Sequence, residues 1–118
     1  MPGTILVVDD ELGYREMLQM DLSCRGFRVL TASDGREGLA ILERERVDLV
    51  ITDMKMPKMD GLDFVVALQR MHPEIPVVLM TGYAVEDRVQ EALAIKAKTC
   101  LRKPFQIAEL EAAVGAIL

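Results

Sequence analysis

The sequence predicts an α/β fold in which a doubly wound parallel sheet of five strands carries helices on both faces. Short apolar runs alternate with segments of helical periodicity along the whole 118-residue chain. Three of the five runs are nearly continuous in valine, isoleucine and leucine, as is typical of strands buried on both faces of a parallel sheet. No repeat or linker-like stretch interrupts the alternation, so we expect one domain over residues 1–118.

The five predicted strands are short, and the segments between them have the periodicity of amphipathic helices. The strands are expected over residues 5–8, 27–30, 47–52, 77–81 and 99–102. The apolar residues that recur three or four positions apart in the five helical segments are Tyr14, Leu18 and Leu22; Leu39 and Leu42; Leu62, Val65 and Val66; Val85, Val89 and Leu93; and Ile107, Leu110, Val114 and Ile117. Because strand–helix–strand crossovers are right-handed, such units give a sheet covered on both sides.

Capping residues mark where several of these helices begin and end. Asp34 and Asp60 each precede a helical segment and are followed three residues later by a second acidic residue, which suits the unpaired amides of a helix N-terminus. The residues expected to end the first and third helices are Gly26 and Pro73.

Polar residues occupy the carboxyl ends of the predicted strands, where open parallel sheets bind ligands. They are Asp9 and Asp10 after the first strand, Asp53 after the third, Thr81 at the end of the fourth and Lys103 after the fifth. If the strand order is 2-1-3-4-5, the first and third strands are neighbours and the three carboxylates converge. Each residue alone has an ordinary explanation, such as a helix cap or a solvated lysine, but their joint occurrence favours a site.

Converging carboxylates need a positive partner. Two aspartates about 5 Å apart repel by roughly 3 kcal/mol at an effective dielectric constant near 20. Lys103 is one candidate, and a magnesium ion is the other, because Mg²⁺ prefers oxygen ligands and typically joins carboxylates to a phosphate. In such a site Asp53 can attack phosphorus as a nucleophile, while Lys103 neutralises the phosphoryl oxygens and the Thr81 hydroxyl binds one of them.

Four motifs lie in order along the chain: ILVVDDE at residues 5–11, VDLVITDMKMPKMDG at 47–61, LMTGY at 79–83 and LRKPF at 101–105. As an ordered set they resemble the receiver domains of bacterial two-component response regulators. The resemblance covers essentially the whole chain and implies a flavodoxin-like fold. It also implies phosphorelay signalling by a switch that is not a conventional enzyme but catalyses its own phosphorylation and dephosphorylation.

The resemblance implies a role for each site residue. Asp53 is expected to accept the phosphoryl group from a sensor histidine kinase or a phosphotransfer protein. The expected ligands of Mg²⁺, for which Mn²⁺ can substitute, are Asp10, Asp53 and the backbone carbonyl of Lys55, with Asp9 acting through water. The residues expected to contact the phosphoryl group are Thr81 and Lys103, and Lys103–Pro104 is expected to be a cis peptide.

Phosphorylation of a receiver is expected to shift an equilibrium of the surface formed by the fourth helix, fifth strand and fifth helix. That surface would control an output domain or partner protein, with transcription as the expected process, and could form a homodimer. Two residues depart from the family pattern there. Cys100 replaces the usual switch aromatic, which puts ring-based coupling in doubt, and Lys96 replaces a glycine. Lys55 and Tyr83 occupy positions that tune phosphoryl lifetime in relatives.

Composition excludes several other classes. The net charge of -5 and pI near 4.9 argue against direct nucleic-acid binding. Cys24, Cys100 and the single His72 have neither disulfide-framework nor zinc-site spacing. No apolar run approaches a membrane span, and no leader pattern begins the chain, so a cytoplasmic protein is expected. The apolar end at Leu118 leaves open a segment of a longer regulator or a stand-alone protein.

Two other functions are compatible with parts of this pattern. A haloacid-dehalogenase-like phosphatase also uses an aspartyl nucleophile and magnesium, but it needs a second aspartate where this chain has Lys55. A docking module that works without phosphorylation would explain Cys100 but not the complete acidic set.

Overall fold

The sheet has the architecture that the sequence predicts. In the computed structural model, which describes residues 3–56, 59–82, 87–95 and 97–118, five parallel strands pair in the order β2-β1-β3-β4-β5. The strands are β1 Thr4–Val8, β2 Arg28–Ala32, β3 Leu49–Asp53, β4 Val77–Thr81 and β5 Ala97–Arg102. The predicted fold class and strand order are therefore confirmed.

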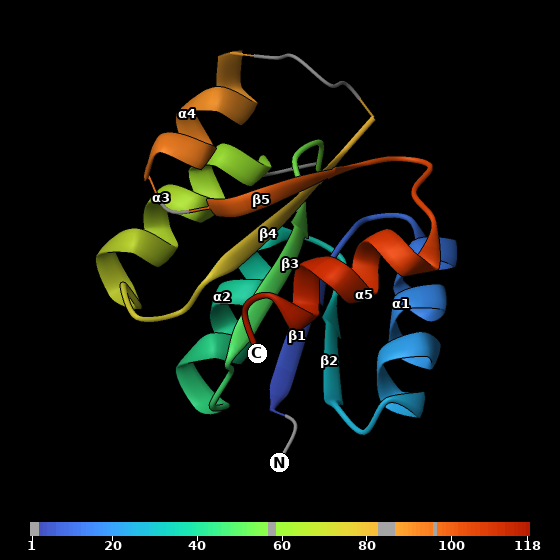
Figure 1. Ribbon diagram of the computed structural model, residues 1–118. Helices are drawn as coiled ribbons and strands as arrows, with labels where there is room; N and C mark the ends of the chain where they lie inside the picture. The colour runs from blue at the N-terminus through green and yellow to red at the C-terminus, as the bar shows by residue number, and fades with distance from the viewer. Residues whose placement is uncertain (1–2, 57–58, 83–86, 96) are drawn as a thin grey trace.

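Helices cover both faces of this sheet. They are α1 Leu12–Cys24, α2 Gly35–Arg44, α3 Gly61–Met71, α4 Asp87–Ile95 and α5 Ile107–Gly115. Figure 1 shows α1 and α5 on one face of the sheet, and α2, α3 and α4 on the other. Among the described helices, none combines the length and the apolar character that crossing a membrane requires.

The alternation of side chains along β1 divides the core into two layers. Ile5 and Val7 point to the face of α1 and α5, where Leu18 and Leu110 are fully buried. Leu6 and Val8 point to the opposite face and pack with α2 and α3. Because β1 has no exposed face, its continuous apolar run has a direct structural cause.

The predicted strand bounds were off by one to two residues at several ends. β2 begins after Phe27, because the Phe27 amide donates to the Leu22 carbonyl at 3.1 Å and closes α1 instead of joining the sheet. It then continues to Ala32, which pairs opposite Val8. β5 begins at Ala97 and not at residue 99, alongside an irregularity in its pairing with β4.

The capping predictions are confirmed. The carboxylates of Asp34 and Asp60 accept hydrogen bonds from the amides of Glu37 and Asp63, at 2.9 and 3.0 Å, and so begin α2 and α3. Gly26 follows the end of α1 with a φ of 95°, a conformation that favours glycine. The two aspartate caps fix where α2 and α3 begin after the carboxyl ends of β2 and β3.

Other predictions concern the end of α3 and the region of α4. α3 ends at Met71, two residues before Pro73, as predicted. Val85, Tyr83 and Lys96 lie outside the described residues.

We expect Gly61→Ala to destabilise the protein by about 1–3 kcal/mol, because the start of α3 lies against β3. A Cβ atom at Gly61 would lie 2.6 Å from the Cα of Met54 and 2.7 Å from the carbonyl oxygen of Asp53, both of them backbone atoms. Urea denaturation measures the change. Gly13→Ala in α1 is the matched control, since its Cβ would meet no atom of the described residues within 4 Å. This variant should be as stable as the wild type or more stable. Equal stability of the two variants would contradict this packing argument.

Candidate functional site

The acidic residues converge at the carboxyl edge of the sheet. β1 and β3 are hydrogen-bonded neighbours, so Asp9 after β1 and Asp53 at the end of β3 lie side by side. Asp9 is 0% exposed and Asp53 is 5% exposed, whereas Asp10 is exposed. Carboxylate oxygens of Asp9, Asp10, Glu11 and Asp53 all lie within 4.8 Å of one another. The sheet topology thus assembles four carboxylates in one place.

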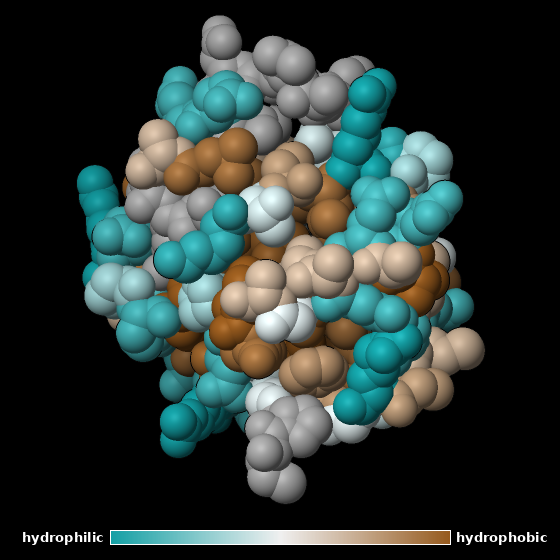
Figure 2. Space-filling view, viewed as in Figure 1, coloured by the Kyte–Doolittle hydropathy of each residue, from teal (hydrophilic) through white to brown (hydrophobic). Residues whose placement is uncertain are grey.

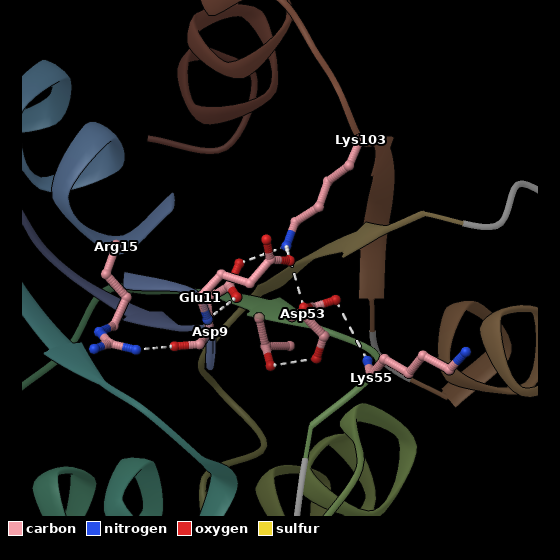
Figure 3. A network of polar contacts seen from close by, with 7 residues as sticks. Asp9, Glu11, Arg15, Asp53, Lys55 and Lys103 are labelled. Carbon is pink, nitrogen blue, oxygen red and sulfur yellow. Dashed lines mark hydrogen bonds and ion pairs between the residues drawn. The ribbon is translucent and has the colours of Figure 1, made fainter. Parts of the chain in front are cut away.

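Lys103 supplies the positive charge at the centre of this cluster (Figure 3). Its Nζ donates to Asp9 Oδ2 at 2.7 Å and to Asp53 Oδ2 at 3.1 Å. A third hydrogen bond, at 3.2 Å, reaches Oε1 of the exposed Glu11. Because the Lys103 side chain is only 9% exposed and the two aspartates are buried, the ion pairs with Asp9 and Asp53 are poorly screened by solvent.

The pKa values of Asp9 and Lys103 are both raised, for different reasons. Burial raises the pKa of the Asp9 carboxyl, and this effect outweighs the hydrogen bonds from Lys103 and from the Glu11 amide, which lower it. Burial by itself would lower the pKa of Lys103, but the hydrogen bond and charge of Asp9, together with Asp53, raise it above 10.5. The Lys103 side chain therefore stays protonated and positively charged at neutral pH.

Backbone and side-chain hydrogen bonds orient the two buried carboxylates. Asp9 Oδ1 accepts from the Glu11 amide at 2.9 Å, and the Asp9 carbonyl accepts from Arg15 Nη1 at 2.7 Å. Asp53 Oδ1 accepts from the Lys55 amide at 3.3 Å. One oxygen of each carboxylate is thus bonded to the segment that follows it, which leaves the other oxygen directed at Lys103 (Figure 3).

An open pocket of about 670 Å³ gives access to this cluster. The residues that line it are Asp10, Glu11, Tyr14, Asp53, Lys55, Met56, Gly82, Lys103 and Pro104. A Cβ at Gly82 would meet no atom of the described residues within 4 Å. The pocket is large enough for a phosphoryl group to approach the Asp53 carboxylate from solvent.

The family of the chain follows from comparison with known proteins. Residues 5–115 match the model of the response regulator receiver domain. The chain belongs to this family. The receiver therefore acts in two-component phosphorelay signalling, as a phosphoryl-accepting switch.

Relatives of the receiver include proteins of very different length. It is 38% identical to sporulation initiation phosphotransferase F of Bacillus subtilis over 114 residues, which cover 97% of this chain and 92% of that protein. It is 40% identical over 118 residues to the probable transcriptional regulatory protein TcrX of Mycobacterium tuberculosis, covering 99% of this chain and 50% of that protein. The receiver thus spans nearly all of the first relative but about half of the second.

Solved structures support the same assignment. The chemotaxis protein CheY4 of Vibrio cholerae is 33% identical, with a TM-score of 0.93 and complete coverage of both chains. The response regulator TrrA of Thermotoga maritima, solved in complex with Mg²⁺ and BeF, is 32% identical, with a TM-score of 0.89 and complete coverage of both chains. The flavodoxin-like fold expected from the sequence is therefore shared with known receivers.

Thr81 and Cys100, which the sequence analysis also singled out, lie on β4 and β5. Thr81 is the last residue of β4 and is buried, and its carbonyl accepts from the Lys103 amide at 2.7 Å. Cys100 lies on β5, is partly exposed, and packs against the core layer of α2, α3 and α4, away from the residues that line the pocket. Burial raises the pKa of the Cys100 thiol, which disfavours a reactive thiolate. The Lys103–Pro104 peptide is cis, as predicted.

Sequence reasoning missed three residues of the receiver site. Glu11 bonds Lys103, Arg15 bonds the Asp9 carbonyl, and Tyr14, which we assigned to the apolar stripe of the first helix, instead lines the pocket. All three lie in the first turn of α1 or directly before it. The signal available in the sequence was their closeness to Asp9, since a helix that begins at the carboxyl end of β1 must place its first turn over the site.

We expect Asp9→Asn to stabilise the receiver more at pH 7 than at pH 4. The native state retains the Asp9 proton to a higher pH than the unfolded chain, whose carboxyl has the ordinary pKa of 3.8. The contribution of Asp9 to the free energy of unfolding therefore falls as the pH rises from 3.8 through the raised native value, and this loss is absent in the variant.

Urea denaturation at the two pH values tests this pH dependence. Glu43→Gln, which removes an exposed carboxylate from α2, controls for the change in net charge. An advantage of Asp9→Asn that is equal at both pH values, or larger at pH 4, would contradict the expected pH dependence.

Proposed function

We propose that the receiver accepts a phosphoryl group on Asp53 from the phosphohistidine of a sensor histidine kinase or a phosphotransfer protein. The observation that carries this assignment is the position of the Asp53 carboxylate. It lies at the end of β3, in the wall of the open pocket, with Oδ2 3.1 Å from the Lys103 ammonium. Of the two buried aspartates in the cluster, only Asp53 lines the pocket.

In the proposed transfer, a carboxylate oxygen of Asp53 forms a bond to phosphorus while the phosphorus–nitrogen bond of the donor breaks. The imidazole leaves with the electron pair of that bond. Lys103 then pairs with a phosphoryl oxygen, and the Thr81 hydroxyl donates to another. Later attack of water on phosphorus breaks the bond from phosphorus to the Asp53 oxygen, which restores the carboxylate and releases inorganic phosphate and a proton. In both steps the receiver supplies the same residues, so we propose that it catalyses its own phosphorylation and dephosphorylation.

The donor set around Asp53 fits a magnesium ion. Its oxygens come from carboxylates within 4.8 Å of one another, and hard oxygen ligands are those that Mg²⁺ and Mn²⁺ prefer. Asp10, Asp53 and the backbone carbonyl of Lys55 are the proposed ligands, with Asp9 acting through water. When bound, the ion would supply positive charge to the phosphoryl oxygens. The Lys103 ammonium already pairs with carboxylates of this cluster, so a bound ion and the ammonium would interact with the same carboxylates.

We propose that phosphorylation is transmitted through the surface formed by α4, β5 and α5. β5 is an edge strand, so this surface is available to an output domain, a partner protein or a second receiver. Cys100 on β5 has no ring. This favours transmission of the signal through the hydrogen bond from the Lys103 amide to the Thr81 carbonyl. Because TcrX is a probable transcriptional regulatory protein, we propose control of transcription as the output.

Asp53→Asn is expected to abolish phosphorylation, because the amide cannot act as the nucleophile. The assay is incubation with acetyl phosphate and Mg²⁺, followed by phosphate-affinity electrophoresis. Asp34→Asn is the matched control. It makes the same chemical change at the N-terminus of α2, where asparagine also caps a helix, and it should be retarded like the wild type. A retarded Asp53→Asn band, or no retarded wild-type band, would refute the assignment.

Lys103→Met is expected to strengthen Mg²⁺ binding by on the order of tenfold, because it removes a cation that repels the ion at close range. Asp10→Asn is expected to weaken binding, since it removes a proposed ligand. Isothermal titration calorimetry at constant ionic strength measures both affinities, with Asp34→Asn as the control. Weaker binding by Lys103→Met, or no uptake by the wild type at millimolar Mg²⁺, would contradict the proposed metal site.

A further inference from the structure

An aromatic ring lies against the ammonium group of Lys103. The Nζ atom of Lys103 lies 4.0 Å from the centroid of the Tyr14 ring, over its face. Tyr14 belongs to the first turn of α1 and lines the open pocket. The lysine ammonium is therefore enclosed by carboxylates and by one aromatic ring, which accounts for its exposure of only 9%.

A second ring fixes the orientation of the first. The centroids of Tyr14 and Phe105 are 5.8 Å apart with an interplanar angle of 45°, a tilted arrangement that aromatic pairs favour. Phe105 packs against the core layer beneath α1 and α5. The Tyr14 ring thus has a support on the segment that follows β5, two residues from Lys103 itself.

Packing of α1 does not account for this position of the tyrosine. Leu18 and Leu22 attach α1 to the core and are fully buried, whereas Tyr14 is partly exposed at the pocket. A cation over an aromatic face is attracted by the negative potential of the ring, most strongly where water is excluded. Besides its contact with Phe105, the Tyr14 ring therefore interacts with the Lys103 ammonium.

We propose that Tyr14 is a positioning residue for phosphoryl transfer, because its ring face holds the Lys103 ammonium over the Asp53 carboxylate. This inference rests on the proposed function of Asp53. Lysine has a long, flexible and strongly hydrated side chain, so an uncovered ammonium would lose rotamer order and gain water. The ring limits both effects, and it leaves the ammonium directed at the place where phosphoryl charge develops.

Substitutions at Tyr14 separate the ring from the hydroxyl and from simple bulk. Tyr14→Phe retains the aromatic face and should be phosphorylated by acetyl phosphate and Mg²⁺ at the wild-type rate. Tyr14→Leu retains apolar bulk and helix propensity but lacks the ring, and its rate constant should fall about fivefold. Thermal denaturation of both variants reports whether α1 remains folded.

Ring electronics provide a readout that a structural role would not affect. Fluorine atoms withdraw electron density from an aromatic face with little change of shape, so phenylalanine analogues with increasing fluorination at position 14 should be phosphorylated progressively more slowly. A rate constant independent of fluorination would overturn the proposal, because a ring that only fills space gives that result. Equal rates for wild type and a folded Tyr14→Leu would overturn it as well.

A measurement without phosphorylation keeps this inference distinct from the proposed function. In NMR spectra of the unmodified receiver, the ring should shift the signals of the Lys103 methylene protons next to the ammonium upfield, in wild type and Tyr14→Phe but not in Tyr14→Leu. An absent shift would overturn the contact itself. Failure of the wild type to be phosphorylated while the shift is present would instead overturn the role of Asp53, and the positioning role with it.

Discussion

The ion pairs between Lys103 and the buried carboxylates of Asp9 and Asp53 are the interaction on which the rest of the site depends. Each carboxylate alone would be costly to bury, and two of them together repel. The ammonium lies within 3.1 Å of both, and it compensates a charge density that the strand topology imposes. In the proposed function, a phosphoryl group or a metal ion would enter a network whose charges are already in place.

The fold determines this network through the order of its strands. With β1 and β3 as neighbours, the two aspartates must lie side by side, and with β5 at the edge beyond β4, Lys103 must reach them across the end of β4. The hydrogen bond from the Lys103 amide to the Thr81 carbonyl holds the backbone of Lys103 at the end of β4. The backbone that would sense a phosphoryl group is therefore the backbone that positions the lysine.

Much of this could be predicted from the sequence because the signals are local. Continuous apolar runs predicted the strands, acidic caps predicted two helix starts, and the strand-end residues predicted the carboxylate cluster. The contacts of Glu11 and Tyr14 with Lys103 were missed because they join the first turn of α1 to the end of β5, and only the packed sheet brings these segments together. The predicted start of β2 was wrong because the Phe27 amide bonds the end of α1 and not the sheet.

The sequence separation of the site residues has a consequence for folding. Asp9 and Lys103 are 94 positions apart, and Asp53 and Lys103 are 50 apart. The cluster is therefore built from contacts between residues that are far apart in the sequence. Such contacts require most of the chain to be ordered and form late when they close large loops. A partly folded chain whose last strand has not docked has the aspartates but lacks their lysine. In the proposed function, a molecule would therefore be able to accept the phosphoryl group only once β5 has joined the sheet.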